Sequence, residues 1–178
     1  MTRGVYRPTP PSGIIPVVVP VDLMLIREPG LAVTAGGITV FPTGFAFSVL
    51  ILFDSRQHKP PAEFARDQHE YDSMTWIEMR YADGPYRQYD MPQDYDMPQD
   101  LSGSQLARPR ITTQEGQGSR SGEWGWIRSV YWVTPLPPPG PVELVIHVNG
   151  REGLTGTGIL DGGLLVEAAQ EASISEHE

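Results

Sequence analysis

The sequence has 178 residues, with 13 Lys and Arg against 22 Asp and Glu, a formal net charge of -9 at pH 7, and no cysteine. Because this acidic chain has no run of basic residues, it would repel a phosphate backbone, which argues against nucleic-acid binding and against binding to an acidic membrane surface. The lack of cysteine excludes disulfides, thiolate nucleophiles and iron–sulfur clusters built from this chain.

Glycine and proline indicate a chain with many turns. The 19 glycines and 18 prolines make up more than one fifth of the residues, a composition typical of β-rich proteins with long loops. The only apolar run near the N-terminus, residues 17–26, is interrupted by Pro20 and Asp22 and lacks a small-residue cleavage site. We therefore expect a cytoplasmic protein that is neither secreted nor membrane-spanning.

Period-two patterns predict strands in the first third of the chain. The first strand is expected over residues 17–27 and the second over residues 31–41, where "TAGG" is either a tight hairpin turn or a bulge in one long strand. In "FAFSVLILF", residues 45–53, both faces are mostly apolar. This pattern predicts a central strand that is covered on both sides.

Further strands are expected in the second half. The stretch "SMTWIEMRYADG" alternates polar and apolar residues before a turn at Asp83-Gly84. The strongest signal is a strand over residues 124–134, an extended proline-rich connection and a strand over residues 142–148. Glu143 and His147 then point away from the core, where His147 is expected to be a surface residue.

The last element is expected to be a helix. Leu154–Leu160 could add one more strand, and Asp161 is either a helix N-cap or part of a hairpin turn. The apolar residues that follow keep helical spacing, which favours the helix. Seven or eight short strands and one short C-terminal helix predict an all-β, antiparallel β-sandwich.

The expected domain organisation has three parts. An extended arm covers residues 1–16, and the β-sandwich domain covers residues 17–172 with long loop excursions at residues 54–73 and 89–122. An acidic tail covers residues 173–178.

Four stretches carry a resemblance to a known family. "RSVYWVTPLPPPGPVELVIHV", "VFPTGFAFSVLILF", "YADG" and "LDGGLLVEAA" resemble, in sequence and in order, a family of small uncharacterised bacterial proteins with a Trp- and Pro-rich hairpin. The resemblance implies a shared sandwich fold. It implies no chemistry, because the family has no assigned function.

Three tryptophans and three prolines are the candidate contact residues for a partner. Trp124, Trp126 and Trp132 have the same parity on one predicted strand, so they form either part of the core or an exposed stacking surface for a sugar or a peptide. The stretch "PLPPPGP" either stiffens the connection or is a polyproline ligand for an aromatic groove. Its candidate contact residues are Pro137, Pro138 and Pro139.

Metal sites are not supported by the spacing of the candidate ligands. The repeat "YDMPQDYDMPQDL" contains four aspartates that could bind calcium, but it lacks the central glycine and terminal glutamate of an EF-hand loop. A duplication tolerated in a loop is the simpler interpretation. The second group matches no known ligand spacing and comprises His58, Glu63, Asp67, His69 and Glu70. We predict no metal and no cofactor.

Catalytic motifs are also absent from the sequence. "GQGSRSGEWG" does not form a G-x-S-x-G motif, and acid–base catalysis would require carboxylates to converge in a pocket. The carboxylates considered are Asp22, Asp54, Glu78 and Asp83. We predict no catalytic residue.

The sequence therefore favours a non-enzymatic binding module that contacts a protein partner, or itself, through loops or an open sheet edge. The alternative is a structural subunit of a larger homo- or hetero-assembly. A third hypothesis is a hydrolase that uses carboxylates.

Overall fold

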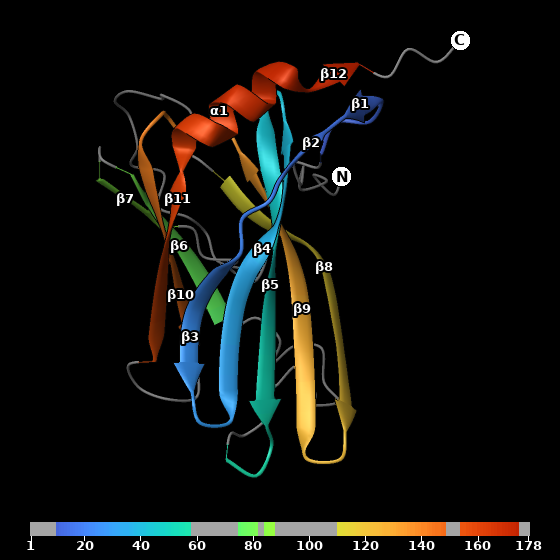
Figure 1. Ribbon diagram of the computed structural model, residues 1–178, viewed down its shortest axis with the longest axis vertical. Helices are drawn as coiled ribbons and strands as arrows, with labels where there is room; N and C mark the ends of the chain where they lie inside the picture. Colours follow the sequence, from blue (N-terminus) through green and yellow to red (C-terminus); the bar gives the residue numbers. More distant parts are fainter. Residues whose placement is uncertain (1–9, 58–74, 82–83, 88–109, 149–153, 175–178) are drawn as a thin grey trace, which may run out of the picture.

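The computed structural model of the chain describes residues 10–57, 75–81, 84–87, 110–148 and 154–174. These residues form an all-β fold of antiparallel sheets with one helix near the C-terminus, as predicted from the sequence. The two larger sheets pack face to face, and the helix lies across one end of them (Figure 1).

The larger sheet has six strands and lies at the front of Figure 1. Its main path is β2 (Val17–Val19), β4 (Leu31–Phe41), β5 (Gly44–Asp54), β9 (Trp124–Thr134) and β8 (Arg110–Ser121). β3 (Leu23–Glu28) also pairs with β4, beside β2. Within the described ranges, β8 is the last strand on its side of this sheet.

The second sheet has four strands, in the order β11 (Thr155–Asp161), β10 (Pro141–Val148), β6 (Thr75–Tyr81) and β7 (Gly84–Arg87). A two-residue pairing joins β1 (Ile14–Ile15) to β12 (Ser173–Ile174) at the end of the molecule where the helix lies.

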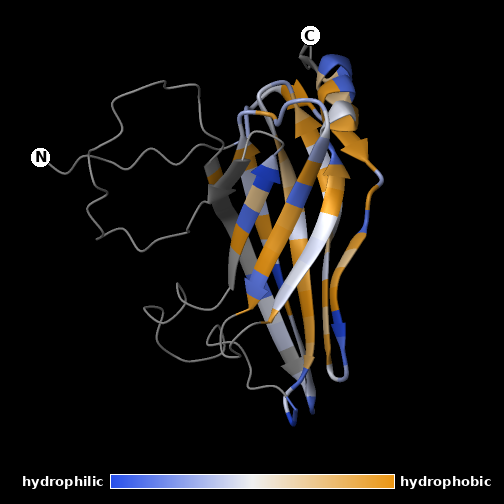
Figure 2. Ribbon diagram, turned by 90° about the vertical axis from the view of Figure 1, so that its left-hand side faces the viewer, coloured by the Kyte–Doolittle hydropathy of each residue, from blue (hydrophilic) through white to orange (hydrophobic). Residues whose placement is uncertain are grey.

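The core lies between the two larger sheets because their strands alternate as the sequence pattern predicts. From β5, the side chains of Phe45, Phe47, Val49, Ile51 and Phe53 are all buried in one cluster. The facing sheet contributes alternate residues of β6 and β10 to the same cluster: Ile77, Met79, Tyr81, Val142, Leu144 and Ile146. Figure 2 shows hydrophobic residues along the strands and hydrophilic residues at the lower turns. Each fully buried aliphatic or aromatic side chain of this kind contributes about 1.5–3 kcal/mol to folding.

The sandwich closes on one side where β11 contacts β3. A Cβ atom at Gly156 would collide with the backbone of Leu25 and the side chain of Ile26. Glycine at this position therefore allows the two strands to approach closely.

The helix α1 (Gly162–Glu171) begins where the sequence predicted an N-cap. The carboxylate of Asp161 accepts a hydrogen bond from the Gly163 backbone N at 2.8 Å. Leu165 and Ala168 are buried in the core cluster, and α1 packs against β2 and β4. The helical interpretation of this segment is confirmed, with Leu164 on its exposed side.

Two segments expected to be irregular contain strands. Ile14 and Ile15, expected in the N-terminal arm, pair with Ile174 and Ser173, which were expected in the acidic tail. Residues 110–121, expected in a loop excursion, form β8 along the whole length of β9. Polar residues and glycines can form this strand because β9 supplies its hydrogen-bond partners on one side. Residues 58–73 and 89–109 lie outside the described residues.

The strand bounds, the strand pairing and the exposure of side chains decide three further expectations. The strand expected over residues 17–27 is divided into β2 and β3 between Val19 and Leu23, where Pro20 lies. "TAGG" is a bulge within one long strand, since the pairing of β4 with β5 shifts between Gly36 and Thr39. β5 is central but is not covered on both sides, because Leu52 on its outer face is 40% exposed.

Candidate functional site

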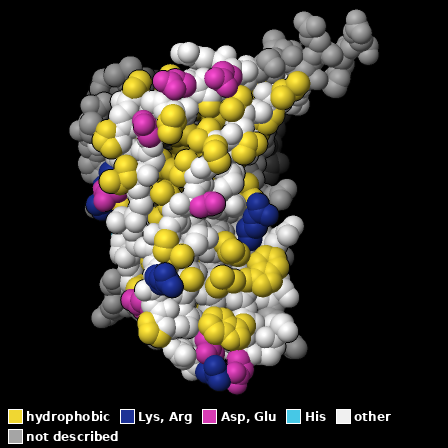
Figure 3. Space-filling view, in the orientation of Figure 1, with side chains coloured by type: hydrophobic (Ala, Val, Ile, Leu, Met, Phe, Trp, Pro, Cys, Tyr) yellow, Lys and Arg dark blue, Asp and Glu magenta, His cyan; other side chains and the backbone are white. Residues whose placement is uncertain are grey.

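Large apolar side chains are exposed on the outer face of the six-stranded sheet. Four of them lie on β3, β5 and β9: Trp124 (53% exposed), Trp126 (36%), Leu52 (40%) and Met24 (52%). Figure 3 looks onto this face and shows hydrophobic side chains in its upper and lower halves, with basic and acidic side chains between and below them. We call these four residues, together with Arg27 and Arg128, the aromatic face.

The alternation of β9 explains why its tryptophans point outward. Ile127, Tyr131 and Val133 are buried in the core cluster, so the even-numbered residues of β9 face away from the core. Gly125 also faces inward, where the ring of Phe53 occupies the space that a Cβ atom would need. Small and aliphatic residues therefore take the inner positions, and the large indoles remain outside.

The strand register arranges the aromatic face in rows that cross the sheet. One row runs from Ser121 on β8 through Trp124 to Asp54. The next contains Ser119, Trp126, Leu52, Ala32 and Arg27. A third contains Gln117, Arg128, Leu50, Thr34 and Met24. Residues from two distant stretches of the chain, 24–54 and 117–128, thus meet on one face of the sheet.

The two arginines of this face are not held by ion pairs to other described residues. Arg27 and Arg128 are both exposed, and neither forms an ion pair within the described residues. Arg56 and Arg80, by contrast, each bind two carboxylates. The aromatic face therefore combines exposed indoles with two exposed guanidinium groups.

Trp132 does not belong to this surface, which corrects the prediction of a three-tryptophan platform. It has the parity of Trp124 and Trp126 but is only 1% exposed. The ring of Phe41 packs against its ring edge to face, with centroids 5.4 Å apart and planes at 81°. Trp132 is a packing residue in this structure, and its ring is not offered to a partner.

The predicted proline contacts lie away from the tryptophans. Pro137 is buried, whereas Pro138 and Pro139 are exposed. This connection follows the far end of β9 and lies against the start of α1, where the Gly162 backbone N donates to the Gly140 carbonyl oxygen at 2.7 Å. The structure therefore does not bring the prolines and the exposed indoles into one site.

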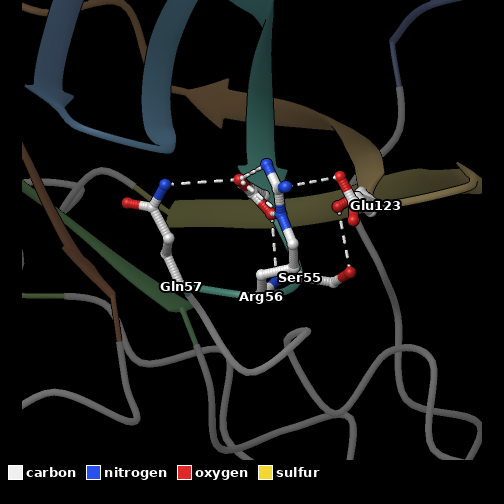
Figure 4. A network of polar contacts seen from close by, with 5 residues as sticks. Ser55, Arg56, Gln57 and Glu123 are labelled. Atoms are coloured by element: carbon white, nitrogen blue, oxygen red, sulfur yellow. Dashed lines mark hydrogen bonds and ion pairs between the residues drawn. The ribbon is translucent and has the colours of Figure 1, made fainter.

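A polar cluster fixes the end of the sheet beside Trp124 (Figure 4). The buried carboxylate of Asp54 accepts hydrogen bonds from Arg56 Nη2 at 2.8 Å and from the Arg56 backbone N at 2.9 Å. Arg56 also pairs with Glu123 at 2.7 Å, and Ser55 donates its backbone N and its hydroxyl to the Glu123 carbonyl oxygen. These bonds tie the end of β5 to the β8–β9 turn and so hold the start of β9 in place.

The same hydrogen bonds change the ionisation of Asp54. The Arg56 side chain, followed by the Arg56 backbone N, lowers the pKa of Asp54 from 3.8 to about 2, against the opposing effect of burial. The Asp54 hydrogen bond in turn raises the pKa of Arg56. The pair is therefore ionised throughout the neutral range.

A second polar cluster lies on the outer face of the four-stranded sheet. Arg80 Nε donates to the buried Glu78 carboxylate at 2.9 Å, and this hydrogen bond raises the pKa of Arg80. Arg80 also reaches Glu143 at 3.3 Å. His147 Nε2 is 3.6 Å from Glu78, and His147 Nδ1 is 3.2 Å from the Thr155 hydroxyl. Glu143 and His147 thus point away from the core, as predicted.

The carboxylates considered for acid–base catalysis do not converge in the described residues. Asp54 and Glu78 lie on different sheets and are each bound by an arginine. Asp22 lies over Gly36 on the six-stranded sheet, and Asp83 lies outside the described residues.

No group of three or more potential ligands that could hold a metal ion occurs in the part of the chain that the structure describes. Both groups considered from the sequence, the aspartates of residues 89–101 and the histidine group of residues 58–70, lie outside it. In the described ranges, no helix is long and apolar enough to cross a membrane.

Comparison with family models, with curated proteins and with solved structures found no match to this chain. The resemblance to a family of small bacterial proteins therefore stays a prediction. The candidate site rests on the geometry of the chain itself.

Proposed function

We propose that the protein is a non-enzymatic binding module that contacts a protein partner through the aromatic face. The observation that carries this proposal is the exposure of Trp124 and Trp126 side by side on β9, next to the edge strand β8. Neither indole fills the core, and tryptophan is a residue type that is enriched at protein interfaces.

A partner that covers these rings gains the free energy of removing their apolar surface from water. A tryptophan buries about 200 Å² when fully covered, so the exposed half of Trp124 amounts to about 100 Å². At about 25 cal/mol per Å², covering it stabilises a complex by about 2.5 kcal/mol before the costs of association. Trp126 and Leu52 add to this area in the adjacent row.

The composition of the face favours a protein over a sugar as the partner. Trp, Met and Arg are the residue types enriched at protein interfaces, and Trp and Arg dominate binding hot spots. Leu52 and Met24 lie where a sugar site would need hydrogen-bonding side chains. The Asp54–Arg56–Glu123 cluster holds the neighbouring turn, so the surface is ordered before binding.

Selection of peptides tests this function directly. A random peptide library displayed on phage is selected against the purified protein, and enriched peptides are titrated against the wild type, Trp126→Ala and Ile159→Ala. Ile159 is the matched control, because it is an exposed apolar residue of the other sheet.

We expect peptides that bind the wild type and Ile159→Ala equally and lose at least about tenfold in affinity with Trp126→Ala. Failure to enrich any peptide, or equal binding to all three proteins, would show that the aromatic face is not the contact surface.

A structural role in a larger assembly is the second candidate, and a separate apolar group favours it. Ile15, Val18 and Leu164 are exposed on β1, β2 and α1, toward the other end of the molecule. Two apolar surfaces would allow each subunit to contact two neighbours. Light scattering during size-exclusion chromatography tests this role. An assembly that Val18→Asp disrupts would support it, and a monomer at high concentration would contradict it.

A further inference from the structure

The proposed contact surface ends at β8, which is an edge strand among the described residues. β8 pairs with β9 on one side, and no other strand of the described residues pairs with it. Its lower half, from Glu115 to Ser121, keeps a regular register with β9 and has no proline. An edge of this kind can accept an added strand through backbone hydrogen bonds.

Two of the three outward side chains of this half of β8 are small serines, and the third is the longer Gln117. Ser121 lies opposite Trp124, Ser119 opposite Trp126 and Gln117 opposite Arg128, and all three β8 side chains are exposed. A strand added to β8 would lie about 9.6 Å from β9, two strand spacings away. Long side chains on both strands can meet above small residues at this distance.

β9 presents two indoles and one cation at every second residue. Trp124, Trp126 and Arg128 are spaced about 6.8 Å apart along the strand, and an extended ligand repeats its own side chains at the same distance. Its alternate residues would therefore face an indole, a second indole and a guanidinium in turn. Apolar, apolar and acidic side chains match this order.

The length of the surface matches a short extended segment. From Trp124 to Arg128 the face extends about 14 Å along β9. Five extended residues span the length of the face.

We propose that the partner is an extended segment that adds to β8, antiparallel to it, and carries the order apolar-x-apolar-x-Glu. This inference rests on the proposed function and names the partner's chemistry. Antiparallel pairing agrees with every strand pair of the sheet and is slightly more stable than parallel pairing. In this direction the first apolar residue lies beside Trp124 and the glutamate beside Arg128.

Two peptides of identical composition test the order. Fluorescein-labelled peptides with the core Leu-Thr-Leu-Thr-Glu or the reversed core Glu-Thr-Leu-Thr-Leu, both flanked by Gly-Ser, are titrated by fluorescence anisotropy. We expect the first to bind roughly tenfold more tightly, because reversal removes one indole contact and the charge pair. Equal affinities would overturn the proposed order.

Exchange of charges tests the role of Arg128. Arg128→Glu should weaken binding of the Glu peptide roughly three- to tenfold and strengthen binding of a Lys peptide of otherwise identical sequence. Gln170→Glu is the control for added negative charge, because Gln170 is exposed on α1 outside the aromatic face, and it should leave both affinities within about twofold. Equal effects of the two substitutions would show that Arg128 has no specific contact.

Backbone methylation tests the added strand. The first peptide is made with N-methyl groups on its two Thr residues, or on its two Leu residues. Because alternate residues of an edge strand point their N–H toward the sheet, only one of these forms should lose binding. Loss in neither form would exclude pairing with β8.

Failure of this inference can be separated from failure of the proposed function. Library peptides that depend on Trp126 but lack the apolar-x-apolar-x-Glu order would retain the function and overturn the inference. If no peptide binding depends on Trp126, both are wrong.

Discussion

Replacing each of two tryptophans on the same strand by alanine distinguishes a buried packing residue from an exposed surface residue. Trp132 and Trp124 have the same parity on β9, but one is 1% exposed and the other 53%. With about 200 Å² per indole, Trp132 removes nearly all of this area from water and Trp124 about half of it. At about 25 cal/mol per Å², the areas correspond to about 5 and about 2.5 kcal/mol, both upper estimates.

We therefore expect Trp132→Ala to lower the free energy of unfolding by about 3–5 kcal/mol, including the cavity that it leaves, and Trp124→Ala by about 1–2 kcal/mol. Urea unfolding followed by far-UV circular dichroism measures both, since this signal does not depend on tryptophan fluorescence. The two variants should have the same m-value. Equal losses of stability, or a smaller loss for Trp132→Ala, would refute the assignment of Trp132 to packing and Trp124 to the surface.

Three other predictions concern the stability of the fold. Because the folded-state pKa of Asp54, about 2, is below its ordinary value of 3.8, its ionised form stabilises the protein above pH 3.8, and this contribution is lost as the pH falls toward 2. The difference in unfolding free energy between the wild type and Asp54→Asn should therefore shrink over this range, and a constant difference would contradict the ion pair. Gly125→Ala should cost about 1–3 kcal/mol in urea unfolding, because the added methyl group collides with the ring of Phe53, whereas an unchanged midpoint would show that the ring can move. Asp161→Ala should cost about 0.5–2 kcal/mol through loss of the N-cap bond to Gly163, with Asp161→Asn as the variant that keeps the cap. Equal melting temperatures for these two variants would indicate that the cap does not stabilise α1.

Local patterns in the sequence were sufficient to predict several elements. β5 and β9 follow from period-two alternation of apolar residues, and α1 follows from Asp161 and helical spacing. Trp124–Thr134 was expected with the same bounds as observed. These elements carry their signal within their own residues.

Other features depend on residues far away in the chain. β8 is polar and contains glycine, so its sequence resembles a loop, and only its pairing with β9 makes it a strand. Parity showed that three tryptophans share one side of β9, but it could not show that Phe41 covers Trp132. Arg27 joins the aromatic face only through the register of β3 with β4, which no short pattern determines.

The pairing of β1 with β12 brings early and late parts of the polypeptide together at the pole where α1 lies, and the β8–β9 turn lies at the opposite pole (Figure 1). If the domain were attached to another protein at Ile15 or Ser173, the half of the sandwich that contains the β8–β9 turn would extend into solution. The exposed indoles would then lie far from the attachment point.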